Sequence, residues 1–282
     1  MKAACIILTV LILIAILAVC VMVKFATDIA FEERKREHAQ ASNVFQLVKT
    51  MGVIALNENV SLSVSDRFPY LAAITRNSSN SWSFACFGSV ILIKWVVTSA
   101  HCRKPGTTHR VLLLHDYSRN SSLTYPVLFW RLHEKYNSSK PTPKYDIAVA
   151  KLNVDFYQFS MKSSLFDDKL ATVVEASVWK TVSTMDKKVY LTNDFDKFDA
   201  RVVDKTRCYE GYGVDLDDSL MCVDMSPYED CFVFEFGPLY AGDKVVGVLA
   251  VKPADCDTKL AIFTNVSHYT NWIMRSTHTN YR

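Results

Sequence analysis

The sequence predicts an all-β extracellular domain that follows an N-terminal hydrophobic helix. Short β-rich runs recur along most of the chain and are separated by polar segments such as NSSNS and SRNSS, a pattern typical of antiparallel sandwiches and barrels. Only residues 267–276 near the C-terminus have the pattern of an amphipathic helix. The runs are YLAAIT, SVILIKWVVTS, RVLLLH, YPVLFW, DIAVAKL, ATVVEASVW, KVYLT, CFVFEF, KVVGVLAV and LAIFTNV.

The composition is that of a folded chain with a sizeable core. Of its 282 residues, 50% are hydrophobic and 22% are charged, which excludes a disordered chain. The net charge of +3 is too small to indicate a nucleic-acid partner. The chain has only 8 glycines, whereas average usage would give roughly twenty. Positions that need free backbone rotation are therefore few.

The N-terminal segment sends the chain into the secretory pathway. Residues 3–23 form an apolar run of membrane-spanning length, which favours a signal anchor that comprises residues 1–24. Two observations favour a cleaved signal peptide instead: small residues at Ala18 and Cys20, and basic residues after the run. The chain is therefore expected to be either a single-pass membrane protein with an extracellular C-terminal domain or a secreted protein.

A charged stem or linker over residues 25–53 is expected to lead into one domain over residues 54–282. Six cysteines follow the apolar run, and an even number in an exported chain predicts disulfides. No closely spaced cysteine pair suggests zinc, so neither a metal nor a cofactor is expected. The candidate glycosylation sites, each at an N-x-S/T sequon, are Asn59, Asn77, Asn120, Asn137 and Asn265.

Several motifs, in order, resemble those of the chymotrypsin-like serine proteases. WVVTSAHC at 95–102 resembles the family motif W-V-L/V-T-A-A-H-C. YDIAVAKL at 145–152 resembles N-D-I-A-L-L-K-L, and FTNVSHYTNWI resembles the C-terminal Y-T-R-V-S-x-Y-x-x-W-I. The resemblance covers residues 54–282 and implies two six-stranded antiparallel β-barrels with a C-terminal helix.

The resemblance also assigns roles to individual residues. It places His101 at the catalytic base and Asp146 at the carboxylate that orients the base. It implies three disulfides, which are Cys86–Cys102, Cys208–Cys222 and Cys231–Cys256.

The segment expected to carry the nucleophile departs from the family pattern. Family members read C-x-G-D-S-G-G-P-L, whereas this chain reads CFVFEFGPL. That register places Glu235 at the nucleophilic serine and Val233 at the glycine that donates to the oxyanion. Phe236 is expected to add bulk to the cleft. Further, we expect the His101 imidazole to donate to both Asp146 and Glu235, as an ion triad.

The positions for zymogen activation and for substrate specificity also depart from the family pattern. VIALNENV at 53–60 replaces the basic cleavage site and the Ile-Val-Gly-Gly terminus, and Phe234 replaces the aspartate that would pair with this terminus. In the specificity pocket, the resemblance places Glu229 at the base and Lys252 where a glycine normally lines the wall, and Ala261 is a further pocket position. Lys252 is expected either to seal the pocket by pairing with Glu229 or, like Glu229, to point into solvent.

The sequence therefore predicts a pseudoenzyme, an insect-type serine protease homologue that acts as an extracellular binding or regulatory module. The resemblance suggests proteases, zymogens or protease inhibitors as partners. One alternative is an active trypsin-like endopeptidase with an atypical site. A second alternative is a metal-binding module that uses His101, Asp146 and Glu235.

Overall fold

The strands and short helices of the described residues form two groups of six strands each, with helices between and after them. The apolar segment 3–23, the stem 25–53 and the segment 53–60 lie outside the described residues. The computed structural model describes residues 70–78, 81–92, 94–114, 123–139, 143–153, 172–185, 188–229, 235–254, 257 and 259–278.

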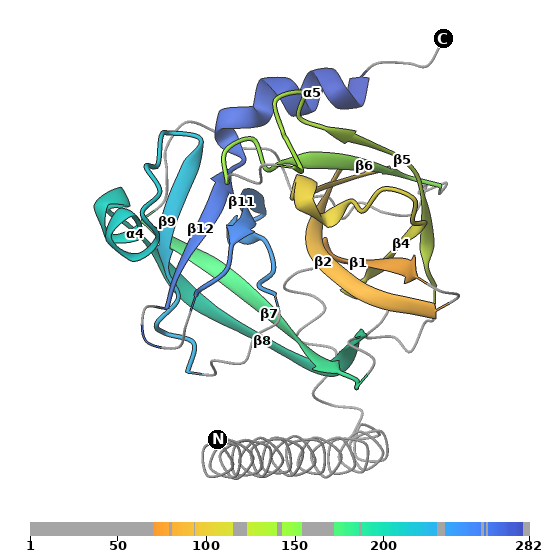
Figure 1. Ribbon diagram of the computed structural model, residues 1–282, viewed down its shortest axis with the longest axis horizontal. Helices are drawn as coiled ribbons and strands as arrows, with labels where there is room; N and C mark the ends of the chain where they lie inside the picture. The colour runs from red at the N-terminus through yellow and green to blue at the C-terminus, as the bar shows by residue number, and fades with distance from the viewer. Residues whose placement is uncertain are drawn as a thin grey trace, which may run out of the picture. The chain divides into compact units, whose positions relative to one another are not determined.

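The first group of strands closes into an antiparallel barrel in the order β1-β2-β3-β6-β5-β4 (Figure 1). β1 pairs with both β2 and β4, so the described sheet has no free edge at this point. Its strands are β1 (Leu71–Ser78), β2 (Ser81–Leu92), β3 (Trp95–Thr98), β4 (His109–Leu113), β5 (Tyr125–Leu132) and β6 (Ala148–Leu152).

A second antiparallel barrel follows in the order β10-β11-β12-β9-β8-β7. Both barrels therefore have six strands each, which confirms the fold class that the sequence predicts. The strands of this barrel are β7 (Val173–Ser183), β8 (Val189–Val203), β9 (Leu220–Asp224), β10 (Leu239–Ala241), β11 (Lys244–Val251) and β12 (Leu260–Asn265).

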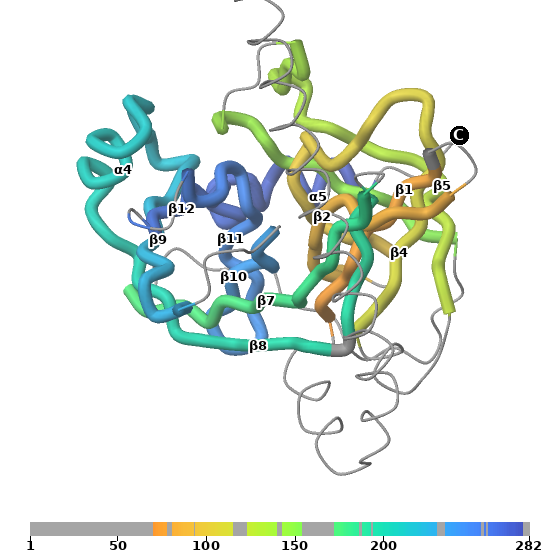
Figure 2. The backbone as a smooth tube through the Cα atoms, turned by 60° about the horizontal axis from the view of Figure 1, so that its bottom comes forward, coloured from red at the N-terminus to blue at the C-terminus, as the bar shows by residue number. Residues whose placement is uncertain are grey.

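The β7–β8 hairpin connects the cores of the two barrels. These strands run side by side from the second barrel toward β2 (Figure 2). Trp179 of β7 is buried in the core of the first barrel, where it stacks on Phe87 with ring centroids 6.2 Å apart. Its indole nitrogen donates to the Thr192 carbonyl at 2.6 Å, which satisfies the buried polar end of the ring.

Short helices complete the described fold: η1 (Ala100–Cys102), α4 (Lys205–Tyr212), η2 (Ser267–Tyr269) and α5 (Thr270–His278). α4 is capped at its N-terminus by Asp204, whose carboxylate accepts from the Thr206 amide at 2.9 Å, and at its C-terminus by Gly213, which has a φ of 65°. α5 buries Trp272 and Ile273, which confirms the amphipathic helix expected at the C-terminus. Within the described ranges, no helix is both long and apolar enough to span a bilayer.

Candidate functional site

His101 and Asp146 extend from neighbouring strands of the first barrel. Thr98 at the end of β3 pairs with Ala148 at the start of β6. Because these strands are antiparallel, the residues just beyond Thr98 and just before Ala148 leave the barrel at the same edge. The Asp146 carboxylate accepts from the His101 ring nitrogen Nδ1 at 2.6 Å and from its backbone nitrogen at 2.9 Å.

The second barrel supports this pair through two hydrogen bonds. The Thr264 hydroxyl on β12 donates to the Asp146 carbonyl at 3.0 Å. The Ser99 hydroxyl, next to η1, donates to the Leu249 carbonyl on β11 at 2.5 Å. Asp146, Thr264, Ser99 and Leu249 are all buried, and only His101 is partly exposed. The site is therefore built on packed elements of both barrels.

The environment favours the protonated form of the His101 imidazole. Burial lowers its pKa, but the hydrogen bond and negative charge of Asp146, together with the charge of Glu235, outweigh burial and raise the pKa above 6.5. About 35% of the His101 side chain remains exposed, compared with 5% for Asp146. The pair is therefore a buried anion that holds a partly exposed cation.

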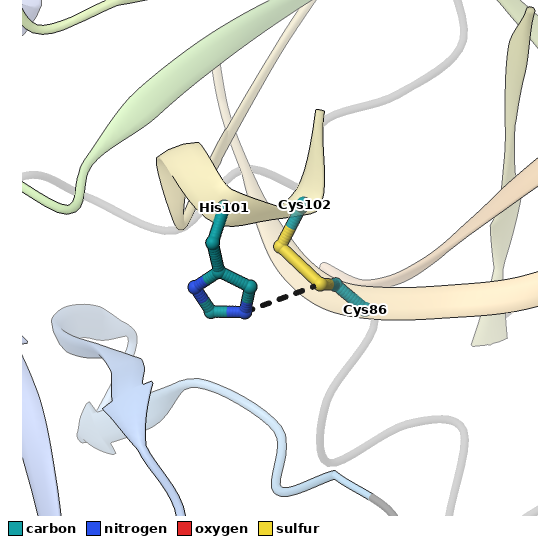
Figure 3. Close-up of side chains that lie close together, drawn as sticks. All are labelled: Cys86, His101 and Cys102. Carbon is teal, nitrogen blue, oxygen red and sulfur yellow. Dashed lines mark hydrogen bonds between the residues drawn. A yellow bond between two sulfur atoms is a disulfide. The ribbon is translucent and has the colours of Figure 1, made fainter. Parts of the chain in front are cut away.

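Glu235 contributes a desolvated carboxyl group to the same site. Burial raises its pKa from 4.5 to about 7, the charge of Asp146 adds to this, and His101 and Lys252 oppose it. The expected ion triad is nevertheless wrong in its geometry. No hydrogen bond joins His101 and Glu235, both of which are described, and His101 Nε2 lies instead 3.6 Å from Cys86 Sγ (Figure 3).

Gly237 anchors the segment that begins at Glu235. Its amide donates to the Ser177 carbonyl of β7 at 2.8 Å. A Cβ at Gly237 would lie only 2.0 Å from Ser177 Oγ, so this close approach requires glycine. The contact therefore explains why the GPL sequence at 237–239 begins with glycine. Glu235 lies two residues before this glycine, at the position that the family motif gives to the nucleophilic serine.

Phe236 does not occupy a cleft, contrary to expectation. Its side chain is buried in the core of the second barrel, with ring centroids 6.2 Å from Tyr228 and 6.4 Å from Phe198. Phe198 and Tyr228 stack on each other at 5.2 Å. Because a large apolar side chain gains most when removed from water, the ring packs inward rather than beside His101.

The expected pocket residues do not form the predicted ion pair. Glu229 and Lys252 are both exposed and make no ion pair with each other, whereas Ala261 is buried on β12. Lys259, rather than Lys252, contacts the backbone of this segment. Its ammonium group donates to the carbonyl oxygens of Tyr228 at 3.1 Å and Glu229 at 3.5 Å.

Two of the three disulfides implied by the sequence are present. Cys86–Cys102 joins β2 to η1, beside His101, and Cys208–Cys222 joins α4 to β9. The third, Cys231–Cys256, lies outside the described residues, as do Val233, Phe234, Asn59 and Asn120. Of the remaining sequons, Asn137 is exposed, whereas Asn77 and Asn265 are half-buried.

Sequence reasoning missed three parts of the site: Thr264, Ser99 and the contact between His101 Nε2 and Cys86. A signal existed for Thr264, because a lone hydroxyl in the apolar run LAIFTNV requires a hydrogen-bond partner when buried. Ser99 stands beside His101 in WVVTSAHC, but nothing in that motif identifies Leu249 as its acceptor.

The sequence is similar to those of fly trypsins. The Trypsin family profile matches residues 60–273. Trypsin epsilon of Drosophila erecta is 26% identical over 224 residues, which cover 75% of this chain and 83% of that protein. Trypsin alpha-4 of Lucilia cuprina is 28% identical over 195 residues, covering 65% of this chain and 72% of that protein.

Solved structures show the same fold at lower identity. Neuropsin, a serine protease expressed in the limbic system of mouse brain, superposes with a TM-score of 0.58 and 20% identity, covering 76% of this chain and 96% of its own. HL collagenase gives a TM-score of 0.61 and 23% identity, covering 76% of this chain and 95% of its own. These likenesses establish the two-barrel architecture.

Proposed function

Because the chain belongs to the trypsin family of serine proteases, we propose that it is a non-catalytic member that acts as a binding or regulatory module. The observation that carries this proposal is Glu235, which we assign to the position of the nucleophilic serine. Its carboxyl group is desolvated and interacts electrostatically with His101 and Asp146. His101 and Asp146, at the positions of the base and its orienting carboxylate, are thus retained beside the carboxyl group of Glu235.

The chemistry of peptide hydrolysis requires more than this pair. A serine protease uses a hydroxyl nucleophile, whose proton passes to the histidine, and two backbone N–H donors for the oxyanion. A glutamate cannot form the serine ester that the family uses, because it has no hydroxyl group. Val233, which we assign to the oxyanion glycine, is a β-branched residue that resists glycine-like backbone conformations.

The alternative metal-binding module is not favoured by the geometry. It would use His101, Asp146 and Glu235 as ligands. Both Asp146 oxygens already accept hydrogen bonds from His101, through the ring and through the backbone. Because Nδ1 donates to Asp146, His101 offers only Nε2 to a cation, and among the described residues His101, Asp146 and Glu235 do not form a cluster of ligand atoms.

Covalent labelling tests the proposal directly. Fluorophosphonates react with the activated serine of serine hydrolases, so the full-length chain should remain unlabelled before and after treatment with trypsin, once the trypsin has been removed. Trypsin epsilon of Drosophila erecta, produced in the same way, serves as the positive control. Labelling of this chain that heat denaturation abolishes would reveal an active nucleophile and support the atypical endopeptidase instead.

We propose that its partners belong to the classes of protein that bind to this fold, which are proteases, zymogens and protease inhibitors. The support is the retention of the two barrels and of the His101–Asp146 pair in a chain whose N-terminal sequence predicts export. A pull-down with the chain, compared with one using the Glu235→Ala variant, should enrich such proteins. Equal recovery by both baits would place the binding surface away from Glu235, and recovery of none of these classes would contradict the assignment.

A further inference from the structure

Three atoms with the chemistry of zinc ligands meet at η1. Cys86 Sγ, His101 Nε2 and Cys102 Sγ all lie within 4.8 Å of one another (Figure 3). The two sulfurs are joined as a disulfide, a form in which they are not thiolate ligands. If the bond is reduced, both sulfurs become potential ligands beside the imidazole.

The distance between the sulfur and the imidazole nitrogen fits tetrahedral zinc. Zinc binds thiolate sulfur at about 2.3 Å and imidazole nitrogen at about 2.0 Å, so a tetrahedral site separates these two ligand atoms by about 3.5 Å. Cys86 Sγ and His101 Nε2 are 3.6 Å apart. Two thiolates in such a site are separated by about 3.8 Å, so the sulfurs need only move apart once their bond is broken.

The ring of His101 is already oriented as a metal ligand. Its Nδ1 donates to the Asp146 carboxylate at 2.6 Å, which leaves Nε2 facing Cys86. In zinc proteins, a carboxylate commonly accepts from the other ring nitrogen in this way, which fixes the orientation of the ring and strengthens its ligand atom. Asp146 therefore provides the outer support that a zinc-binding histidine requires.

We propose that reduction of the Cys86–Cys102 disulfide by a dithiol creates a zinc site made of Cys86, Cys102 and His101, with water as the fourth ligand. The dithiol gives two electrons and two protons to the sulfurs and becomes a disulfide itself. Zn²⁺ then displaces the two thiol protons and binds neutral Nε2. This site goes beyond the proposed function and does not depend on it.

Exposure at the site allows the cation and a water molecule to enter. The two cysteines are only 3% and 2% exposed, whereas about 35% of the His101 side chain is exposed. A cation would thus approach along the imidazole. The other described disulfide differs, because Cys208 Sγ lies 3.8 Å from the Ala261 carbonyl oxygen and no described histidine is grouped with it.

Titration with Co²⁺, a spectroscopic substitute for Zn²⁺, tests this site. The full-length chain is reduced with a dithiol without denaturant, freed of reductant under anaerobic conditions and titrated with Co²⁺. We expect thiolate-to-cobalt charge transfer, the visible bands of a tetrahedral site and displacement of Co²⁺ by Zn²⁺. Circular dichroism follows the fold throughout, and loss of the native spectrum on reduction would overturn the proposal.

Variants separate this site from other reduced cysteines. The Cys86→Ser/Cys102→Ser variant should lose the thiolate bands, and His101→Ala should weaken Co²⁺ binding at least tenfold. Asp146→Asn, which removes only the outer support, should weaken Co²⁺ binding about 10–100-fold. The matched controls Cys208→Ser/Cys222→Ser and His278→Ala should bind as the native chain does. Unchanged binding in His101→Ala, or unchanged bands in the Cys86→Ser/Cys102→Ser variant, would disprove the site.

Discussion

The Asp146 carboxylate holds His101 at two points, with one oxygen 2.6 Å from the ring nitrogen Nδ1 and the other 2.9 Å from the backbone nitrogen. The orientation of the imidazole is therefore set by the hydrogen bonds of Asp146 and needs neither a substrate nor a nucleophile. The pair can therefore persist as a structural element in the non-catalytic family member that we propose. It also fixes the imidazole near both Cys86 and Glu235.

Restoring a serine should not restore peptidase activity. In Glu235→Ser, two other departures from the family motifs remain, which are Val233 at the position that we assign to the oxyanion glycine and the lack of an Ile-Val-Gly-Gly sequence. Loss of one oxyanion donor alone costs about 10²–10³ in rate. We expect no hydrolysis of peptide substrates with basic, aromatic or small residues before the scissile bond, measured with fluorogenic peptides. Turnover above that of the native chain would show that the oxyanion site is intact.

The close approach of Gly237 to Ser177 should make the effects of substitutions at these two residues on the free energy of unfolding non-additive. Gly237→Ala places a methyl group 2.0 Å from Ser177 Oγ and should reduce the free energy of unfolding by about 1–3 kcal/mol. Ser177 Oγ is buried and has no hydrogen-bond partner among the described residues, so Ser177→Ala should cost little. The double variant should recover most of the loss in urea unfolding experiments.

Gly211 provides the control for that measurement. It lies in α4, and the nearest atom to a Cβ there is Leu260 Cδ1 at 4.0 Å. Gly211→Ala should therefore stabilise the domain by about 0.5–1 kcal/mol through helix propensity. Equal destabilisation by Gly237→Ala with and without Ser177→Ala would locate the strain elsewhere.

The sequence predicted the framework of the site because the framework is carried by local motifs. WVVTSAHC and YDIAVAKL each place a functional residue at a fixed offset from a buried strand, and the pairing of β3 with β6 then brings His101 to Asp146. The barrels follow from the same runs of short strands. However, SVILIKWVVTS divides into β2 and β3 with a turn at Lys94, and neither β9 nor β10 was predicted. The described end of the predicted run CFVFEF, Glu235 and Phe236, is not in a strand.

Side-chain directions could not be predicted in the same way, because they depend on contacts between distant segments. Phe236 turns into the core because Phe198 and Tyr228, from other strands or turns, offer it an aromatic surface. Lys259 reaches the carbonyl of Glu229 from 30 residues away in the chain. Neither contact has a signal in the local sequence.

The structure distinguishes two of the candidate glycosylation sites. Asn137 is exposed, while Asn265 is half-buried and its side-chain nitrogen donates to the Asp218 carbonyl at 3.1 Å. The Asn265 oxygen also accepts from the Ser267 amide at 3.1 Å, so the whole amide is engaged. Glycopeptide mass spectrometry of chain secreted by insect cells should find Asn137 occupied and Asn265 unmodified. A glycan on Asn265 would show that modification precedes folding of this segment.

The buried carboxyl group of Glu235 should make the stability of the domain fall as pH rises. Its folded pKa of about 7 is raised above the ordinary value of 4.5, so the folded state retains a proton that the unfolded state has released. Its favourable contribution is full below about pH 4.5 and is lost as pH rises through about 7. His101, whose pKa is also raised, acts in the same direction from pH 6.5 upward.

Glu235→Gln isolates the contribution of this carboxyl group. At pH 4 the native carboxyl is protonated in the folded state and largely protonated in the unfolded state, so it resembles the amide and the variant should match the native chain within about 0.5 kcal/mol. At pH 9 the native chain must bury a carboxylate, and the variant should be more stable by about 2–3 kcal/mol. Urea unfolding at both pH values measures the difference, with Glu229→Gln as the exposed control that should change neither. A Glu235→Gln variant that is less stable than the native chain at pH 9 would mean that the carboxylate is stabilised by His101 after all, as in the ion triad that the sequence suggests.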